Sequence, residues 1–251
     1  MEQHRNKQIV IDFYKKVIGE QDLDYAEKSV TDNYIQHNPL VRTGKAGFLE
    51  AITFLKQLPK PKKPSKPLMR IITENDHVAV HLNVEFGGQK KIVLEVFRLE
   101  NGLIAEHWDA IQNQSEVSLN GNSEIAGPVL IEDEAETIQN KKIIEEFTEL
   151  VLIAKAFDLL KKFVSPTVIQ HNPEIATGRD GFSTYYQKVD IRKLYKVIGQ
   201  GNFVVTQSKG VLNNKNVVYY AIYRLKNGFI REHWSVSQQI PEVMVHNNGM
   251  I

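Results

Sequence analysis

The sequence contains two pairs of closely similar segments, and this internal repeat constrains the fold more than any other feature. The four segments are IQHNPLVRTGKAGF at 35–48, IQHNPEIATGRDGF at 169–182, FRLENGLIAEHW at 97–108 and YRLKNGFIREHW at 223–234. Self-similarity of this kind is the signature of duplicated structural units. With 251 residues, the chain is long enough for two domains that each bury a core of their own. We therefore expect two copies of one small domain.

The two copies differ in length. The first pair of segments is offset by 134 residues and the second by 126, so the second copy lacks eight residues between them. The first copy carries the segment PKPKKPSKP at 59–67, which fits neither a helix nor a central strand. We expect this segment to be an extended loop with solvated lysines rather than a basic binding patch.

The order of hydrophobic patterns predicts an α+β domain in each copy. Apolar residues at helical spacing come first, and runs typical of β-strands, joined by turn residues, follow them. Helices followed by an antiparallel meander exclude a βαβ dinucleotide-binding fold. In the first copy we expect helices at 5–18, 22–30 and 44–58, and strands at 68–74, 77–86, 90–99 and 103–113. The predicted boundaries are a first domain at 1–114, a polar linker at 115–133 and a second domain at 134–251.

The register of the last hairpin decides which side chains share a face of the sheet. A two-residue turn would leave Glu95 and His107 on opposite faces, whereas a three-residue loop at 100–102 would set them opposite each other. We expect the three-residue loop, because it gathers the ionisable groups on one concave face that the helices cover. That face would carry Glu95, Phe97, His107 and Asp109.

The opposite face of this hairpin is mainly apolar in both copies. It carries Trp108 in the first copy and Trp234 in the second, and an Arg98–Glu106 cross-strand pair is expected beside Trp108. An apolar sheet face has to be buried against something. We therefore expect the two outer faces to pack against each other as a pseudo-dimer within the chain. Whether several copies of the chain associate further stays open.

These motifs resemble the SnoaL-like polyketide cyclase family of the NTF2-like superfamily, and more closely its tandem bacterial members described as SnoaL-like aldol condensation proteins. The segments that carry the resemblance are YIQHNP, GKAGF, FRLENGLIAEHWD and the closing IPE and NNGM of the tail. The resemblance implies cone-shaped α+β barrel domains and an aldol-type closure of a small, largely apolar carbonyl compound, with no metal or organic cofactor.

The resemblance also implies roles for individual residues. Asp109 would be the general acid/base, Glu95 would assist it, and His107 would lie with them in the pocket. The other residues expected around a ligand are His37, Asn38, His81 and Phe97 in the first copy, and His171, Asn172 and His233 in the second.

The second copy departs from the family pattern where the chemistry is expected. Ser235 replaces the aspartate of the EHWD motif, and Ala221 stands at the position that matches Glu95. A serine hydroxyl does not accept a proton near neutral pH without a base beside it. We therefore expect the second copy to be structural or ligand-binding rather than catalytic.

Other interpretations of the same residues stay open. His107 and Asp109 would satisfy each other as a buried pair in a purely structural site, and His37 and Asn38 would simply hold a turn before a proline. A metal site built from His37, His81, Glu95, His107 and Asp109 lacks HExxH-type spacing and any cysteine. The alternative to an enzyme is a non-catalytic protein that holds a small hydrophobic ligand or serves in assembly.

Charge and composition exclude several classes of partner. The 31 basic and 30 acidic residues give a formal net charge of +1, so we expect neither nucleic acid nor an anionic membrane as a partner. The chain has no cysteine, which suits a reducing compartment. It shows no secretion signal and no run of eighteen apolar residues, so we expect a soluble, cytoplasmic protein.

Overall fold

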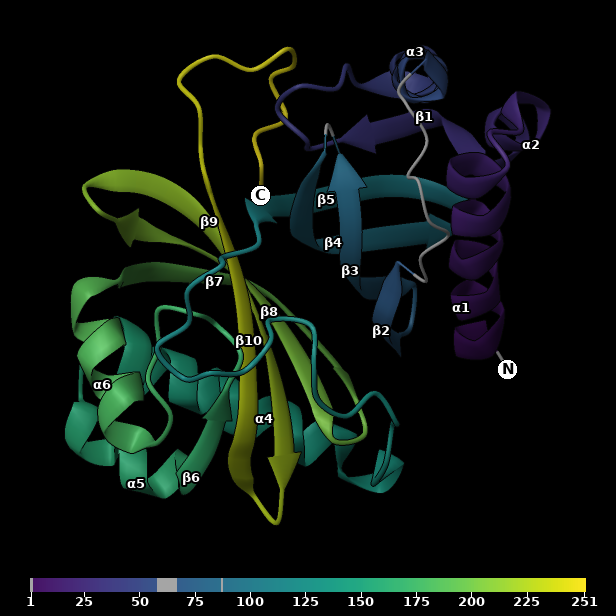
Figure 1. Ribbon diagram of the computed structural model, residues 1–251. Helices are drawn as coiled ribbons and strands as arrows, with labels where there is room; N and C mark the ends of the chain where they lie inside the picture. Colours follow the sequence, from purple (N-terminus) through teal and green to yellow (C-terminus); the bar gives the residue numbers. More distant parts are fainter. Residues whose placement is uncertain (1, 58–66, 87) are drawn as a thin grey trace. The chain divides into compact units, whose positions relative to one another are not determined.

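The computed structural model describes residues 2–57, 67–86 and 88–251, so the predicted loop at 59–67 lies outside the described residues except for its last one (Figure 1). The chain forms two compact units. Met1–Asp109 and Pro241–Ile251 make the first unit, and Ala110–Ile240 make the second. This division differs from the expected boundaries. The end of the chain belongs to the first unit, and the expected linker at 115–133 belongs to the second.

The first unit contains short helices and a five-stranded sheet. Its elements are α1 (Glu2–Phe13), η1 (Tyr14–Gly19), α2 (Leu23–Ser29), β1 (Val30–Gln36), α3 (Gly44–Gln57), β2 (Leu68–Glu74), β3 (His77–Phe86), β4 (Gln89–Glu100) and β5 (Leu103–Asn113), of which the last four residues of β5 fall in the second unit. The strand order is β1-β5-β4-β3-β2, with β1 parallel to β5.

The second unit repeats this plan. Its elements are η2 (Glu134–Glu136), α4 (Thr137–Phe147), η3 (Thr148–Ile153), η4 (Phe157–Leu159), α5 (Leu160–Phe163), β6 (Val164–Gln170), α6 (Arg179–Lys188), β7 (Asp190–Gln200), β8 (Phe203–Leu212), β9 (Lys215–Lys226) and β10 (Phe229–Gln239). The strand order is β6-β10-β9-β8-β7, with β6 parallel to β10. The α+β class is therefore confirmed for both units, although each sheet is mixed rather than wholly antiparallel.

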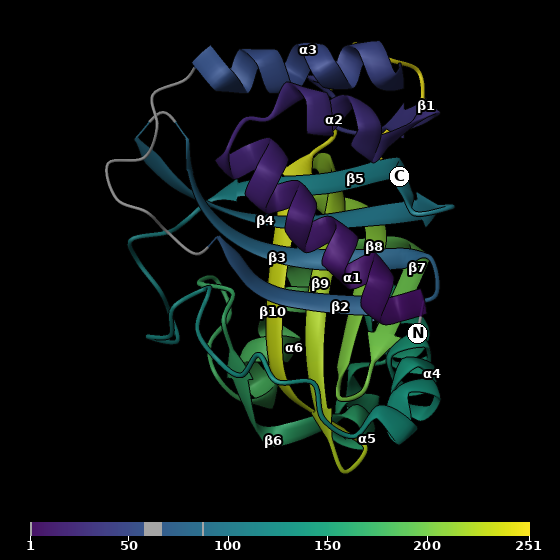
Figure 2. The same cartoon turned by 90° about the vertical axis from the view of Figure 1, so that its right-hand side faces the viewer.

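Helix α1 covers the concave face of the first sheet. It lies diagonally across β2 and β3 (Figure 2), and the side chains that it and η1 bury include Val10, Phe13, Tyr14 and Val17. Phe13, Tyr14 and Val17 follow the helical period, which is one reason why the sequence predicted this helix. Helix α2 begins one residue after the predicted start, because Asp22 caps it: the Asp22 carboxylate accepts a hydrogen bond from the backbone N–H of Tyr25 at 2.9 Å.

Two details of the fold differ from the sequence-based expectation. The first is β1, whose residues 31–36 had been assigned to no helix or strand. Its burial does not alternate along the strand, so it gives no two-residue period. The second is the hairpin turn, which has two residues rather than three. Asn101 and Gly102 both have positive φ, as a type I′ turn requires.

The second unit shows how such a turn still gives the expected faces. Lys226 pairs with Phe229 across the equivalent turn, and the register then shifts by one residue between Ile230 and Glu232. Beyond this bulge, Ser235 lies opposite Ala221. A bulge therefore puts the matching side chains of the two strands on one face, as the three-residue loop had been expected to do.

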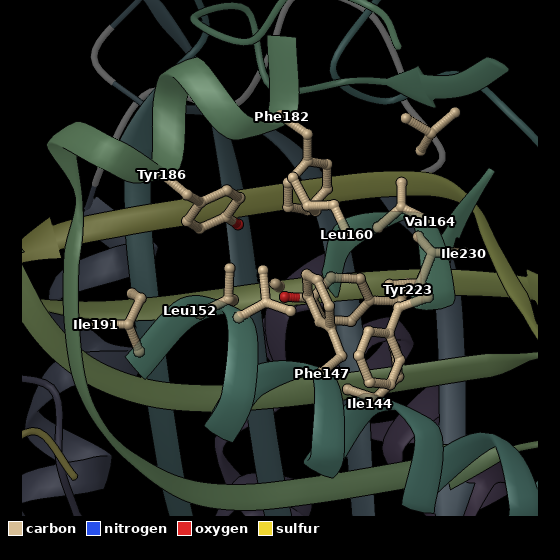
Figure 3. Packing of buried hydrophobic residues seen from close by; sticks show 14 of the residues in the cluster. Ile144, Phe147, Leu152, Leu160, Val164, Phe182, Tyr186, Ile191, Tyr223 and Ile230 are labelled. Atoms are coloured by element: carbon tan, nitrogen blue, oxygen red, sulfur yellow. The ribbon is translucent and has the colours of Figure 1, made fainter. Parts of the chain in front are cut away.

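The core of the second unit is dense in aromatic side chains. Figure 3 shows Phe147, Phe182, Tyr186 and Tyr223 converging from two helices and a strand, and all four are almost fully buried. Phe147 makes edge-on contacts with Phe182 and Tyr223 at centroid distances of 5.7 and 5.8 Å. The interior of this unit is therefore filled by its own side chains.

No helix in the described part of the chain is long and apolar enough to cross a bilayer. The expected packing of the two outer sheet faces on each other stays a prediction.

Candidate functional site

Three ionisable side chains of the first unit converge on the concave face of its sheet. Glu95 on β4 and His107 and Asp109 on β5 place one ligand-type atom each within 4.8 Å of one another. We call these residues the acid cluster. The Asp109 residue is 4% exposed, and the side chains of Glu95 and His107 are 15% and 11% exposed. The sequence-based expectation that these three groups share a face is therefore confirmed by the geometry.

Asp109 is held by one of its two carboxylate oxygens. The Asn38 side-chain amide donates to Oδ2 at 2.6 Å, whereas Oδ1 is buried with no hydrogen-bond partner among the described residues. Burial raises the pKa of Asp109 to about 6, Glu95 pushes it in the same direction, and His107 and Asn38 oppose the shift. Asp109 is therefore a buried carboxyl group that exchanges its proton near neutral pH.

Glu95 lies between a phenol and an imidazole. The Tyr14 hydroxyl donates a hydrogen bond to Glu95 Oε2, and His107 Nε2 lies 3.6 Å from the same oxygen. Burial and the Glu95 carboxylate hold the pKa of Tyr14 well above its ordinary value, so the phenol stays a donor. Burial alone would lower the pKa of His107, but Glu95 and Asp109 outweigh it and raise that pKa.

Gln36, at the end of β1, fixes the tautomer of His107. Its side-chain oxygen accepts hydrogen bonds from the backbone N–H groups of His37 and Asn38 and from His107 Nδ1, each at 2.9 Å. Because that oxygen only accepts, Nδ1 of His107 carries the proton and Nε2 faces the cluster. Nε2 has no hydrogen-bond partner among the described residues, since Glu95 at 3.6 Å is too distant.

Aromatic rings surround the acid cluster. Phe97 stacks on the His107 ring with 4.8 Å between centroids, and Phe13 and Tyr14 contact Phe97 at 5.8 and 6.1 Å. A few polar groups in an otherwise aromatic surrounding are typical of sites for small apolar ligands. The two surface hollows described in the structure lie elsewhere, along α3 and beside the turn that follows β9.

Two residues expected around the ligand lie on the other face of the sheet. His37 stacks on Trp108 at 4.8 Å and contacts Glu106 at 2.9 Å, both of which alternate with the cluster residues along β5. His81 pairs with Leu94, the neighbour of Glu95, and contacts Arg70 at 3.0 Å. Both expectations are therefore corrected. Sequence spacing does not show on which face a residue of an unpredicted strand or turn lies.

The outer face does contain the predicted cross-strand pair. Arg98 Nε donates to Glu106 Oε2 at 2.9 Å, and His37 contacts the other carboxylate oxygen. Burial would raise the pKa of Glu106, but His37 and Arg98 together lower it. The equivalent pair in the second unit, Arg224 and Glu232, lies at 3.2 Å.

The second unit keeps the frame of the site without its acids. Asn172 donates to Ser235 Oγ at 2.8 Å, as Asn38 donates to Asp109, and His233 Nδ1 contacts Gln170 at 2.8 Å. His171 stacks on Trp234 at 4.5 Å, on the outer face. Burial lowers the pKa of His233 to about 3, so this histidine is neutral.

Tyrosine side chains occupy the interior of this second site. Tyr186 stands where the first copy has Ile52, and Tyr219 stands where it has Val93. The hydroxyl groups of Tyr186 and Tyr219 are 2.8 Å apart, and that of Tyr186 lies 3.1 Å from His233 Nε2. The second copy has therefore exchanged ionisable groups for bulk, and its expected structural or ligand-binding role stays a prediction.

The acid cluster is also a potential set of metal ligands. One imidazole nitrogen and two carboxylate oxygens within 4.8 Å suit a divalent transition-metal ion in donor type and spacing. Of the five residues weighed as ligands from the sequence, His37 and His81 are not in the cluster. No ligand motif predicted the remaining three, because they come from two strands.

Two contributors to the site were missed in the sequence. Tyr14 had been assigned only to the buried face of a helix, and Gln36 had been passed over in the repeated IQHNP segment. The presence of Gln170 at the matching position was the available signal for Gln36. Tyr14 has no such signal, because the second copy has Thr148 at that position.

Comparisons with known proteins give one family match and several similar solved structures. Residues 8–117 match the family model described as SnoaL-like polyketide cyclase, and no curated protein matches the chain. TsrD from Streptomyces laurentii is 19% identical over 45% of this chain and 91% of its own, with a TM-score of 0.38. A SnoaL-like polyketide cyclase from Agrobacterium tumefaciens is 17% identical over 39% and 91%, with a TM-score of 0.34. An LEH-like epoxide hydrolase from M. tuberculosis is 16% identical over 41% and 85%, with a TM-score of 0.35.

The family match spans the elements that carry the acid cluster, from α1 to β5. The part of this chain that holds the first repeat is similar to the SnoaL-like polyketide cyclase family.

Proposed function

We propose that the first unit is a cofactor-free acid/base enzyme, an aldol-type cyclase, isomerase or lyase, acting on a small, largely apolar carbonyl compound. One observation carries this proposal. A carboxylate oxygen, Asp109 Oδ1, and an imidazole nitrogen, His107 Nε2, are buried in one cluster without hydrogen-bond partners among the described residues. Buried polar atoms without partners are rare and call for an explanation. A bound carbonyl substrate with an acidic C–H group would engage both.

The proposed step is proton removal beside the carbonyl. Asp109 Oδ1 takes the proton from the α-carbon, and the electrons of that C–H bond form the enolate. His107, protonated on Nε2, donates a hydrogen bond to the enolate oxygen, where negative charge develops. In an aldol closure the enolate carbon then attacks a second carbonyl group, and the alkoxide that forms takes the proton from Asp109. In an isomerisation the enolate, conjugated with a neighbouring double bond, takes the proton back from Asp109 at another carbon.

The electrostatics of the cluster suit this division of roles. A general base works best when its pKa lies near the working pH, and burial brings that of Asp109 to about 6. Glu95 and Asp109 raise the pKa of His107, which favours the imidazolium form that donates. The Tyr14 hydroxyl holds Glu95 in place through its hydrogen bond.

Exchange of an α-proton with solvent tests the proposal without knowledge of the natural substrate. We expect the protein to accelerate deuterium incorporation at the α-carbon of 2-tetralone in D₂O, measured by proton NMR. Asp109→Asn is expected to lower this acceleration by about 100-fold or more, the ordinary contribution of a positioned base. Ser235→Ala is the matched control in the second unit and is expected to leave the rate unchanged. Equal rates for wild type and Asp109→Asn would refute the proposal.

Two further arms separate the competing functions. If a chelator abolished the exchange and Zn²⁺ restored it, the cluster would be a metal centre rather than an acid/base pair. The second candidate, a non-catalytic ligand-binding protein, is favoured by the near-complete burial of Asp109. That candidate predicts that 2-tetralone raises the unfolding temperature equally in wild type and Asp109→Asn, with no exchange in either protein.

A further inference from the structure

We propose that the last eleven residues of the chain position the acid cluster, acting through the end of β1. This closing segment, Pro241–Ile251, follows the second repeat in sequence but belongs to the first unit. In Figure 1 it is the yellow trace after β10, and Figure 2 shows it beside β1 and α3. The effect of this segment on catalysis rests on the proposed function, whereas its hydrogen-bonded link to the acid cluster does not.

Asn248 binds the backbone of Gln36. Its side-chain amide donates to the Gln36 carbonyl oxygen and to Thr43 Oγ1, both at 2.9 Å. Thr43 Oγ1 in turn accepts from the Gln36 backbone N–H at 3.2 Å. Both polar groups of the Gln36 backbone are therefore tied into one ring of hydrogen bonds that Asn248 closes.

His246 binds the backbone of Asn38. Its Nε2 donates to the Asn38 carbonyl oxygen at 2.8 Å, and its Nδ1 accepts from the Asn248 backbone N–H at 3.3 Å. The Val245 backbone N–H donates to the Pro39 carbonyl oxygen at 3.1 Å. His246 is 8% exposed, so its bond to Asn38 is shielded from water.

The two residues held in this way are the ones that hold the acid cluster. Gln36 fixes His107 through Nδ1, and Asn38 binds Asp109 through Oδ2. The path from Asn248 to His107, and that from His246 to Asp109, each cross a single residue. A displacement of a few tenths of an ångström at Gln36 or Asn38 therefore reaches the proton acceptor and the hydrogen-bond donor directly.

The second unit contains the same arrangement with an independent set of residues. Asn122 donates to the Gln170 carbonyl oxygen at 3.0 Å, and Asn120 donates to the Asn172 carbonyl oxygen at 2.7 Å. Asn120 and Asn122 follow β5, and they precede His246 and Asn248 by 126 residues, the offset of the hairpin repeat. The segment after each copy's last strand thus closes the other copy's site. In the second unit it leads to Ser235, so it positions no acid there.

This exchange gives the degenerate second copy a role in the first site. It supplies the closing segment, although its own interior is filled by tyrosine. It also gives a rescue variant, because an asparagine, Asn120, already does in the second unit what His246 does in the first.

The test uses the full chain and measures two quantities. The first is the steady-state rate of α-proton exchange on 2-tetralone, and the second is the pH at which the Asp109 carboxyl ionises, read by carbon-13 NMR of labelled aspartate. Asn248→Ala and His246→Ala are expected to lower kcat roughly tenfold with little change in KM. Both are expected to move the ionisation of Asp109 to higher pH. In His246→Ala the weakened Asn38 bond favours the carboxylate less, and in Asn248→Ala the displaced His107 does so.

Matched variants separate positioning from general stability. His246→Asn is expected to restore both quantities, and Asn122→Ala and Asn120→Ala, the counterparts in the second unit, are expected to change neither. If His246→Ala does not fold, His246→Leu keeps the buried volume without the donor and takes its place. Alanine variants that titrate and react like wild type would overturn the inference. If wild type shows no exchange but Asn248→Ala still moves the ionisation of Asp109, the coupling stands and the proposed function fails.

Discussion

Replacing Asp109 with asparagine should stabilise the first unit, and the gain should depend on pH. The side chains are nearly isosteric, and the new amide oxygen accepts the bond that Asn38 Nδ2 now donates at 2.6 Å. What changes is the charge. Wild type has to keep a carboxylate buried above pH 6, whereas the variant does not.

The size of the effect follows from the pKa of Asp109. Burial raises it from an ordinary 3.8 to about 6. An acid whose folded-state pKa is raised contributes stability below its unfolded value, and this contribution is lost as the pH rises through the folded value. At about 1.4 kcal/mol per pH unit, the loss amounts to about 3 kcal/mol by pH 8. Asp109→Asn avoids that loss, so its advantage should grow from near zero at pH 4 to about 3 kcal/mol at pH 8.

Urea unfolding at pH 4, 6 and 8 measures this difference. Trp108 fluorescence in a Trp234→Phe background follows the first unit alone, because each unit has one tryptophan. Ser235→Asn, the equivalent change in the second unit, removes no charge and is expected to show no such pH dependence. A wild type that is more stable than Asp109→Asn at pH 8, or a difference that is the same at all three pH values, would refute the reasoning.

Three further changes test other parts of the structure. Glu106→Gln should destabilise the first unit by about 1 kcal/mol in urea at pH 7 through the lost bonds to Arg98 and His37. Because the pKa of Glu106 is lowered, this loss should shrink as the pH falls below the ordinary value of 4.5 and should vanish once Glu106 is protonated in the folded state. A loss that stays constant as the pH is lowered would contradict that cause. Ala221→Glu with Ser235→Asp should add no activity and should cost the second unit about 3 kcal/mol, because Tyr186 and Tyr219 fill the space and two carboxylates would be buried there. A gain of activity would show that the tyrosine side chains do not block a site in this copy. If the outer sheet faces pack together, Trp108→Glu should speed hydrogen exchange in β9 and β10, and unchanged exchange there would count against that packing.

The sequence predicted the elements whose patterns are local. The helices at the N-terminus and at 44–57 follow the 3.6-residue period, and the strands at 68–74, 77–86 and 103–113 begin and end within a residue of their predicted limits. The facing of Glu95, His107 and Asp109 was also predicted correctly, but for the wrong reason. The turn has two residues, and the bulge seen in the second copy is not encoded by any turn residue.

What the sequence could not show depends on contacts between distant segments. Strand β1 is irregular in burial and is fixed by its parallel pairing with β5, about 70 residues later. The outward facing of His37 follows from that pairing, so its ligand role was mispredicted. The closing segment contacts residues more than 200 positions away, and no local period marks such a partner.

The pH dependence of α-proton exchange tests the central claim most directly. If Asp109 is the base, kcat/KM for 2-tetralone should rise with pH through an apparent pKa of about 6 and should fall again only above the raised pKa of His107. Asp109→Asn should lack the rising limb. A rising limb near pH 4, or one that survives in Asp109→Asn, would show that another group removes the proton.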